Sequence, residues 1–97
     1  MYDIVFSDGA AKYIKENIPI KHRKLMLEKI KLCLGTYLKI KSRRCNKKAI
    51  KGTKPVTYRY HVSMTYTLFY VIDDDAERVF VTDVWGINQA HSKYRTA

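Results

Sequence analysis

The stretch that decides the fold is residues 56–72, VTYRYHVSMTYTLFYVI. In its first part, residues 56–62, bulky residues alternate with polar ones, which is typical of a strand with one buried face. Its second part, residues 66–72, is apolar on both faces and rich in aromatic and β-branched residues. The stretch therefore predicts two strands, the second of them central in a sheet.

The flanking segments extend this sheet. Residues 79–85, VFVTDVW, predict a further strand after a turn built on three consecutive aspartates. Residues 2–6, YDIVF, predict an opening strand. By contrast, residues 43–55 show no periodicity and are dominated by charge, which predicts a loop, and residues 86–97 have no clear period.

Two helices are expected between the opening strand and this loop. The first begins at Ser7 or Asp8, whose side chains can cap the free amides, and ends before Pro19. Its predicted apolar stripe is Ala10, Ile14 and Ile18. The second helix is expected over residues 20–39, with an apolar stripe at Leu27, Ile30, Leu34, Tyr37 and Leu38. The order β-α-α-β-β-β predicts one α+β domain over residues 1–97, a helical hairpin on one face of a small antiparallel sheet.

Length and composition narrow the class of protein. A chain of 97 residues with 46% hydrophobic residues can form one thin core, which excludes a two-domain enzyme. No apolar run reaches the roughly 18 residues of a membrane span, and no secretory signal is evident, so we expect a soluble cytoplasmic protein without a membrane partner. The two cysteines are too few for a disulfide framework. Cys33 is expected to be a small core residue, and Cys45 a free loop thiol.

The charge is strongly basic and unevenly placed. The net charge is +10, and none of the 44 residues between Glu28 and Asp73 is acidic. Eight bases fall between positions 39 and 54. Such a segment repels itself unless a polyanion faces it, so we expect it to bind nucleic acid. The alternative is a solvated helix end and loop.

A group of residues suited to phosphodiester chemistry lies beside this segment. Arg59 and His61 are two apart on a predicted strand, so they share its polar face. Arginine can hold a phosphate, and histidine can exchange protons near neutral pH. Lys48 and Lys51 lie close by in the chain, and His91 and Tyr94 complete the set. The alternative is that Arg59 and His61 are only the solvent side of an edge strand.

Other kinds of site are not expected. His22, His61 and His91 have no metal-ligand spacing, and neither cysteine has a nearby partner for zinc. The four glycines are scattered singly, so there is no phosphate-binding loop. We therefore expect no metal and no cofactor.

The sequence resembles the RelE/ParE superfamily of bacterial and archaeal toxins. The resemblance runs over the opening strand, the helical hairpin, the basic KKAIKG segment, YRYHV, YTLFYVID and a C-terminal tyrosine. It implies the β-α-α-β-β-β fold and one of two activities: cleavage of mRNA in the ribosomal A site, or inhibition of DNA gyrase. It also implies an acidic antitoxin as partner.

The resemblance assigns site residues as well. The basic strand positions of a RelE-type site correspond to Arg59 and His61, and its C-terminal tyrosine to Tyr94, with His91 as a terminal histidine. Ribonuclease members usually have an arginine where this chain has Thr67, and a second arginine after the last strand has no counterpart in WGINQAH. The charge of the transition state would then have to be stabilised by Lys51, Arg59 or another base of the loop.

We therefore expect a toxin that is a metal-independent, ribosome-dependent endoribonuclease. The bases expected to grip RNA are Arg43, Arg44, Lys47, Lys48, Lys51 and Lys54. A gyrase inhibitor and a non-catalytic RNA-binding module on the same fold are the alternatives, and Thr67 favours the latter.

Overall fold

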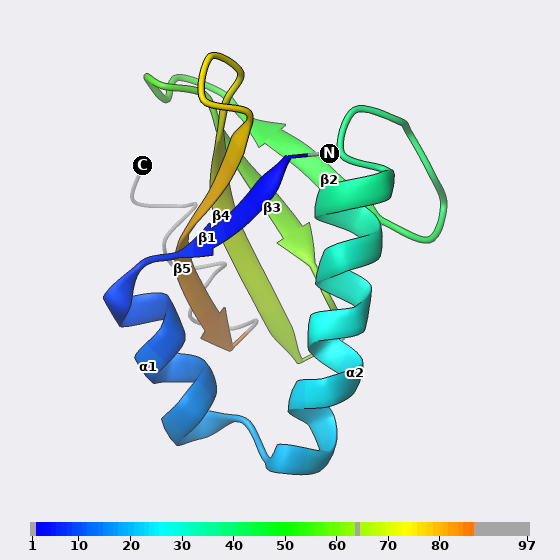
Figure 1. Ribbon diagram of the computed structural model, residues 1–97, viewed down its shortest axis with the longest axis vertical. Helices are drawn as coiled ribbons and strands as arrows, with labels where there is room; N and C mark the ends of the chain where they lie inside the picture. The colour runs from blue at the N-terminus through cyan, green and yellow to red at the C-terminus, as the bar shows by residue number, and fades with distance from the viewer. Residues whose placement is uncertain (1, 64, 87–97) are drawn as a thin grey trace.

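A computed structural model describes residues 2–63 and 65–86. Within them, two α-helices cover one face of a five-stranded sheet (Figure 1). The elements in chain order are β1 (Asp3–Phe6), α1 (Asp8–Asn17), α2 (Ile20–Lys31), a π-helical turn η1 (Leu32–Thr36), β2 (Asn46–Ile50), β3 (Thr57–His61), β4 (Tyr66–Asp73) and β5 (Arg78–Gly86). The predicted α+β class and helical hairpin are confirmed. None of these helices is both long and apolar enough to span a membrane.

The sheet is mixed, which corrects the expectation of an antiparallel one. Its strand order is β1-β5-β4-β3-β2. Neighbouring strands are antiparallel except β1 and β5, which pair in parallel from Asp3 opposite Arg78 to Phe6 opposite Val81. The chain leaves β1 through both helices and enters the sheet at the opposite edge, so the last strand returns beside β1 in the same direction.

The boundaries of α1 follow the predicted signals. The Ser7 hydroxyl accepts a hydrogen bond from the Ala10 amide at 3.0 Å and donates one to the Thr82 carbonyl at 2.7 Å, which ties the helix start to β5. At the other end, the Arg23 side chain donates to the carbonyl oxygens of Ile18 and Lys15. Ala10, Ile14 and Ile18 are buried, as the stripe predicts.

The second helix differs from its prediction in length and in rotation. Regular α-helix ends at Lys31 and continues as the wider turn η1. Its buried side chains include Met26, Ile30 and Leu34, whereas Leu27 is 39% exposed, so the expectation that Leu27 lies in the core is wrong. Isoleucine and leucine residues are frequent around this helix, and only packing decides which of them face the sheet.

The predicted loop over residues 43–55 is also corrected, because Asn46–Ile50 within it form the edge strand β2. Its sequence NKKAI has no apolar alternation. An edge strand tolerates such a sequence because lysines there oppose aggregation through the unpaired backbone. Pairing with β3, from Asn46 opposite His61 to Ile50 opposite Thr57, supplies the hydrogen bonds that the side-chain pattern does not reveal.

Cys33 and Cys45 form a disulfide bond, so the expectation of a free loop thiol is wrong. Their Cα atoms lie 5.6 Å apart, and both side chains belong to the core. The bond joins η1 to the residue that precedes β2. A spacing of 12 residues in sequence says nothing about this approach, which depends on how the loop after η1 folds back.

Leu27 and Ile30 on α2 give a direct test of how the helix is rotated about its axis. Ile30 is 1% exposed and Leu27 is 39% exposed. We expect Ile30→Ala to lower the free energy of unfolding by about 2–5 kcal/mol, since it leaves a cavity in the core. Leu27→Ala should cost less than about 1 kcal/mol. Urea denaturation of both variants measures this difference, and equal losses would contradict the rotation described.

Candidate nucleic-acid interface

Arg59 and His61 lie on the face of the sheet that points away from the helices. Between them, Tyr60 points to the helical side, where its hydroxyl donates to the Lys29 carbonyl at 3.4 Å. Burial raises the pKa of Tyr60 to about 12, so the hydroxyl stays protonated at this contact. Because side chains alternate along a strand, Arg59 and His61 take the opposite face, as the sequence predicts.

The edge strand β2 adds two residues to this face. Lys48 lies opposite Arg59, and Asn46 lies opposite His61. The Arg59 guanidinium donates a hydrogen bond through Nη1 to Asn46 Oδ1 at 3.1 Å. We call Asn46, Lys48, Arg59 and His61 the basic face. It carries cations and one titratable ring within two neighbouring strands, an arrangement that fits a phosphate and a proton transfer.

His61 is held by a residue on the next strand. Its Nδ1 lies 2.6 Å from the hydroxyl oxygen of Thr67, which stands directly opposite on β4. Thr67 is completely buried. At the position where the resemblance implies an arginine, this chain therefore has a hydroxyl within hydrogen-bond distance of a histidine ring.

The predicted RNA-binding bases separate into two groups. Arg43, Arg44, Lys48, Lys51 and Lys54 are exposed. Lys47 instead directs its ammonium group to three backbone carbonyl oxygens, those of Cys33 and Leu38 at 3.0 Å each and that of Tyr37. Burial lowers the pKa of Lys47 from its ordinary value, while the three oxygens favour the charged form. We infer that Lys47 holds the fold rather than RNA.

A groove of about 1410 Å³ is lined by the segment that follows η1 and by residues of β2, β3 and β4, among them Asn46, Lys48 and Arg59 of the basic face. Tyr58 and Tyr70 stack within its lining, with ring centroids 5.2 Å apart and planes at 16°. Basic residues of its lining include Lys41 and Arg43. The groove thus offers aromatic surface together with positive charge.

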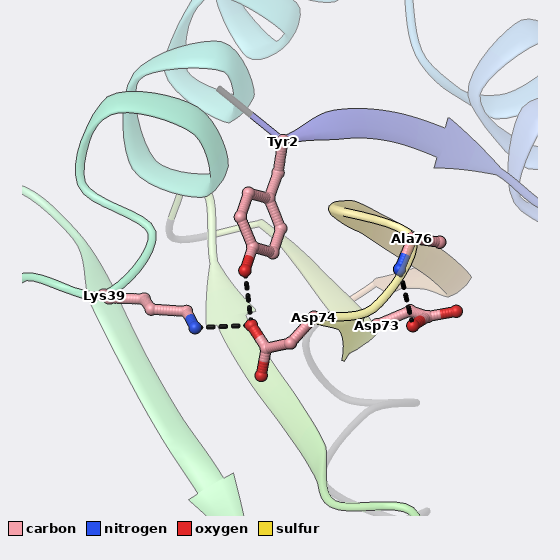
Figure 2. A network of polar contacts seen from close by, with 5 residues as sticks. All are labelled: Tyr2, Lys39, Asp73, Asp74 and Ala76. Carbon is pink, nitrogen blue, oxygen red and sulfur yellow. Dashed lines mark hydrogen bonds and ion pairs between the residues drawn. The ribbon is translucent and has the colours of Figure 1, made fainter.

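Lys39 and Asp74, which belong to the lining of this groove, form a polar network with Tyr2 (Figure 2). Asp74, in the turn before β5, accepts hydrogen bonds from the Lys39 ammonium and from the Tyr2 hydroxyl. The hydrogen bond from Lys39, and next that from Tyr2, lower the pKa of Asp74 below its usual value. The neighbouring Asp73 accepts from the Ala76 amide at 3.1 Å, which shapes the turn. Lys39 therefore forms an ion pair with Asp74.

Two of the predicted site residues are not among those that the structure describes. His91 and Tyr94 lie outside the described residues. Among the residues that are described, no cluster of three or more metal-ligating side chains occurs. Sequence reasoning missed Asn46 and the role of Thr67, because only strand pairing brings them beside Arg59 and His61. The YRYHV and YTLFYVID strands could have indicated the pair of His61 and Thr67 only if their register had been known.

Comparisons with known proteins address the fold. No protein-family model matches the chain, and no curated protein matches it in sequence. Solved structures do match. An archaeal RelE from a RelE–RelB complex of Pyrococcus horikoshii has a TM-score of 0.69 and 14% identity over 88% of this chain and 93% of that one. A metal-bound toxin from Helicobacter pylori has a TM-score of 0.68 and 18% identity over 92% and 98%.

The toxin–antitoxin complex RelBE from E. coli also contains a similar chain, with a TM-score of 0.56 and 22% identity over 88% of this chain and 95% of that one.

Lys47 and Lys48 are adjacent in sequence and point to opposite faces of β2, so they form a matched pair. We expect Lys47→Met to lower the free energy of unfolding by about 1.5–3 kcal/mol, because the three carbonyl oxygens lose their charged hydrogen-bond donor. Lys48→Met should stay within about 0.5 kcal/mol of wild type. Thermal denaturation of both variants checks this, and a stable Lys47→Met variant would return Lys47 to the RNA-binding set.

The similarity covers most of this chain and most of each neighbouring structure's chain. The sequence identities are too low to extend the similarity beyond the fold. This chain has the RelE-like toxin fold.

Proposed function

We propose that this chain is the toxin of a toxin–antitoxin pair and cleaves mRNA on the ribosome as a metal-independent endoribonuclease. The observation that carries the proposal is the basic face, where Lys48, Arg59 and His61 lie together on two paired strands. The RelE-like fold supports it, since solved neighbours are toxins or toxins in complex with RelB.

The basic face supplies two of the three functions that RNA cleavage needs. His61 would take the proton from a ribose 2′-hydroxyl, whose oxygen then attacks the adjacent phosphorus. Arg59 and Lys48 would stabilise the extra negative charge on the phosphorane. The bond from phosphorus to the 5′-oxygen breaks, and an acid protonates that oxygen, which leaves a 2′,3′-cyclic phosphate and a 5′-hydroxyl. We assign the acid to His91 and base stacking to Tyr94 from the family resemblance.

The partners follow from the charge. Exposed bases beside the basic face, Arg43, Arg44, Lys51 and Lys54, would hold the backbone of mRNA or ribosomal RNA. The groove combines basic residues with stacked aromatic rings, which suits an acidic antitoxin segment with apolar side chains. Cytoplasmic location is part of this proposal, because ribosomes and mRNA are found there.

The activity is tested by toeprinting on translating ribosomes. We expect wild-type protein to cut within A-site codons, with a bell-shaped pH profile because one histidine must be neutral and the other protonated. Arg59→Ala, His61→Gln and His91→Gln should each slow cleavage about 10²–10⁴-fold. Lys21→Ala, an exposed change on α2, is the matched control and should leave the rate unchanged.

The outcomes separate the candidate functions. Wild-type rates in the Arg59→Ala, His61→Gln double variant would rule out the basic face as the site. Ribosome binding without cuts would identify an RNA-binding module, and inhibition of DNA supercoiling without cuts would identify a gyrase inhibitor.

The exposed bases predict a salt dependence. Lys48→Glu with Lys51→Glu should weaken ribosome or RNA binding and flatten the slope of log affinity against log salt by about 0.7–0.9 per lost phosphate contact. Lys21→Glu with Lys24→Glu makes the same charge change at two exposed positions of α2 and should leave the slope unchanged. Filter binding over a range of salt concentrations measures it. An equal effect of the two double changes would show that only net charge matters.

A further inference from the structure

Thr67 stands out among the residues that the structure describes because it is polar and its side chain is completely buried. A buried hydroxyl without a hydrogen-bond partner costs free energy. Its partner here is the ring of His61, 2.6 Å away. The buried hydroxyl and the proposed proton acceptor are therefore one unit.

The geometry of this unit is rigid. Thr67 and His61 are directly opposite in the antiparallel pair of β4 and β3. Threonine is β-branched and has few side-chain rotamers in a strand. Neighbouring residues of β4, Leu68 and Phe69, are also buried. The position of the hydroxyl oxygen is thus restricted, and the oxygen can hold the imidazole ring in one orientation.

The contact involves one particular ring nitrogen, Nδ1. In a neutral histidine, the hydrogen bond made by one nitrogen sets which nitrogen carries the proton. A hydroxyl that accepts from the Nδ1–H group can do so whether the ring is neutral or charged, so the contact persists through a proton transfer. A hydroxyl that donated to Nδ1 would lose its acceptor when the ring became protonated.

We propose that Thr67 is a positioning residue that accepts a hydrogen bond from Nδ1–H of His61 and so makes Nε2 the atom that exchanges the proton with RNA. This rests on the proposed ribonuclease function. It also gives a role to the position where the family resemblance implies an arginine: Thr67 acts through His61, and the cations are Arg59 and Lys48.

Charged residues lie on the same sheet face as this ring. The strand register places Lys48 on β2, Arg59 on β3 and Asp83 on β5 in the neighbouring row of this sheet face. They stay in place when Thr67 is changed. A change in the tautomer of His61 on removal of the Thr67 hydroxyl would therefore report the loss of this hydrogen bond.

The first measurement needs no activity. Imidazole ¹⁵N NMR of the isolated protein, with His61 signals assigned from the His61→Gln spectrum, gives the tautomer directly. We expect wild type and Thr67→Ser to show the Nδ1–H form and Thr67→Val, which keeps the shape and lacks the hydroxyl, to lose that preference. Thr57→Val, the same change on β3, should leave the tautomer unaltered. An Nε2–H form in wild type, or no change in Thr67→Val, would overturn the proposal.

The second measurement is cleavage over a range of pH. Thr67→Val should lower the rate about 10–100-fold, the size of loss seen when the partner that orients a metal-bound histidine is removed. The ribosome affinity should be unchanged and the pH profile shifted. Thr67→Ser should restore the rate. Cleavage by wild type with an unaltered rate and pH profile in Thr67→Val would overturn the positioning role alone. Absence of cleavage by wild type would overturn the proposed function, and the positioning role with it, even where the tautomer is as expected.

Discussion

The attachment of the edge strand β2 to the body of the molecule is the constraint on which the candidate site depends. This strand carries adjacent lysines in a segment with no acid between Glu28 and Asp73, so charge repulsion opposes its docking. Two contacts offset that repulsion: the disulfide from Cys33 to Cys45, and the hydrogen bonds from the Lys47 ammonium to carbonyl oxygens within η1 and just after it. The strand can then pair with β3 and bring Lys48 and Asn46 beside Arg59 and His61.

One face of the sheet packs against the helices, and the other carries the basic face. Because side chains alternate along a strand, the same strands contribute residues to both. Tyr60 on β3 is buried against α2, while its neighbours Arg59 and His61 take the other face. The central part of the adjacent strand β4 is buried on both faces, since Leu68 and Phe69 point in opposite directions and both are buried. The basic face is thus next to a strand that is buried in its central part, which limits how far its residues can shift.

The sequence resemblance implies an arginine where this chain has Thr67, and this difference changes how the proposed site would work. An arginine introduced at this position would bring a charge into a fully buried place and would remove the hydroxyl next to His61. Transition-state stabilisation in this chain would instead depend on Arg59, which Asn46 orients through a hydrogen bond, and on Lys48 opposite it. Such a site retains a cation and a proton acceptor, with the positive charge placed on β2 and β3.

Local patterns in the sequence were sufficient for the elements whose physical cause is local. The alternation over residues 56–62 and the apolar run over residues 66–72 correspond to β3 and β4, and Ser7 and Pro19 bound the first helix. The same period of two placed Arg59 and His61 on one face. These inferences hold because strand alternation, capping and the missing proline amide act over a few neighbouring residues.

Tertiary structure alone decided the features that depend on residues far apart in the chain. β2 exists because β3 supplies its backbone partners, the disulfide because η1 folds beside Cys45, and the parallel pairing because β5 returns next to β1. The rotation of α2, which buries Met26 and exposes Leu27, was set by the sheet against which it packs. Thr67 reaches His61 through strand register, and register is a relation between two strands that neither sequence contains by itself.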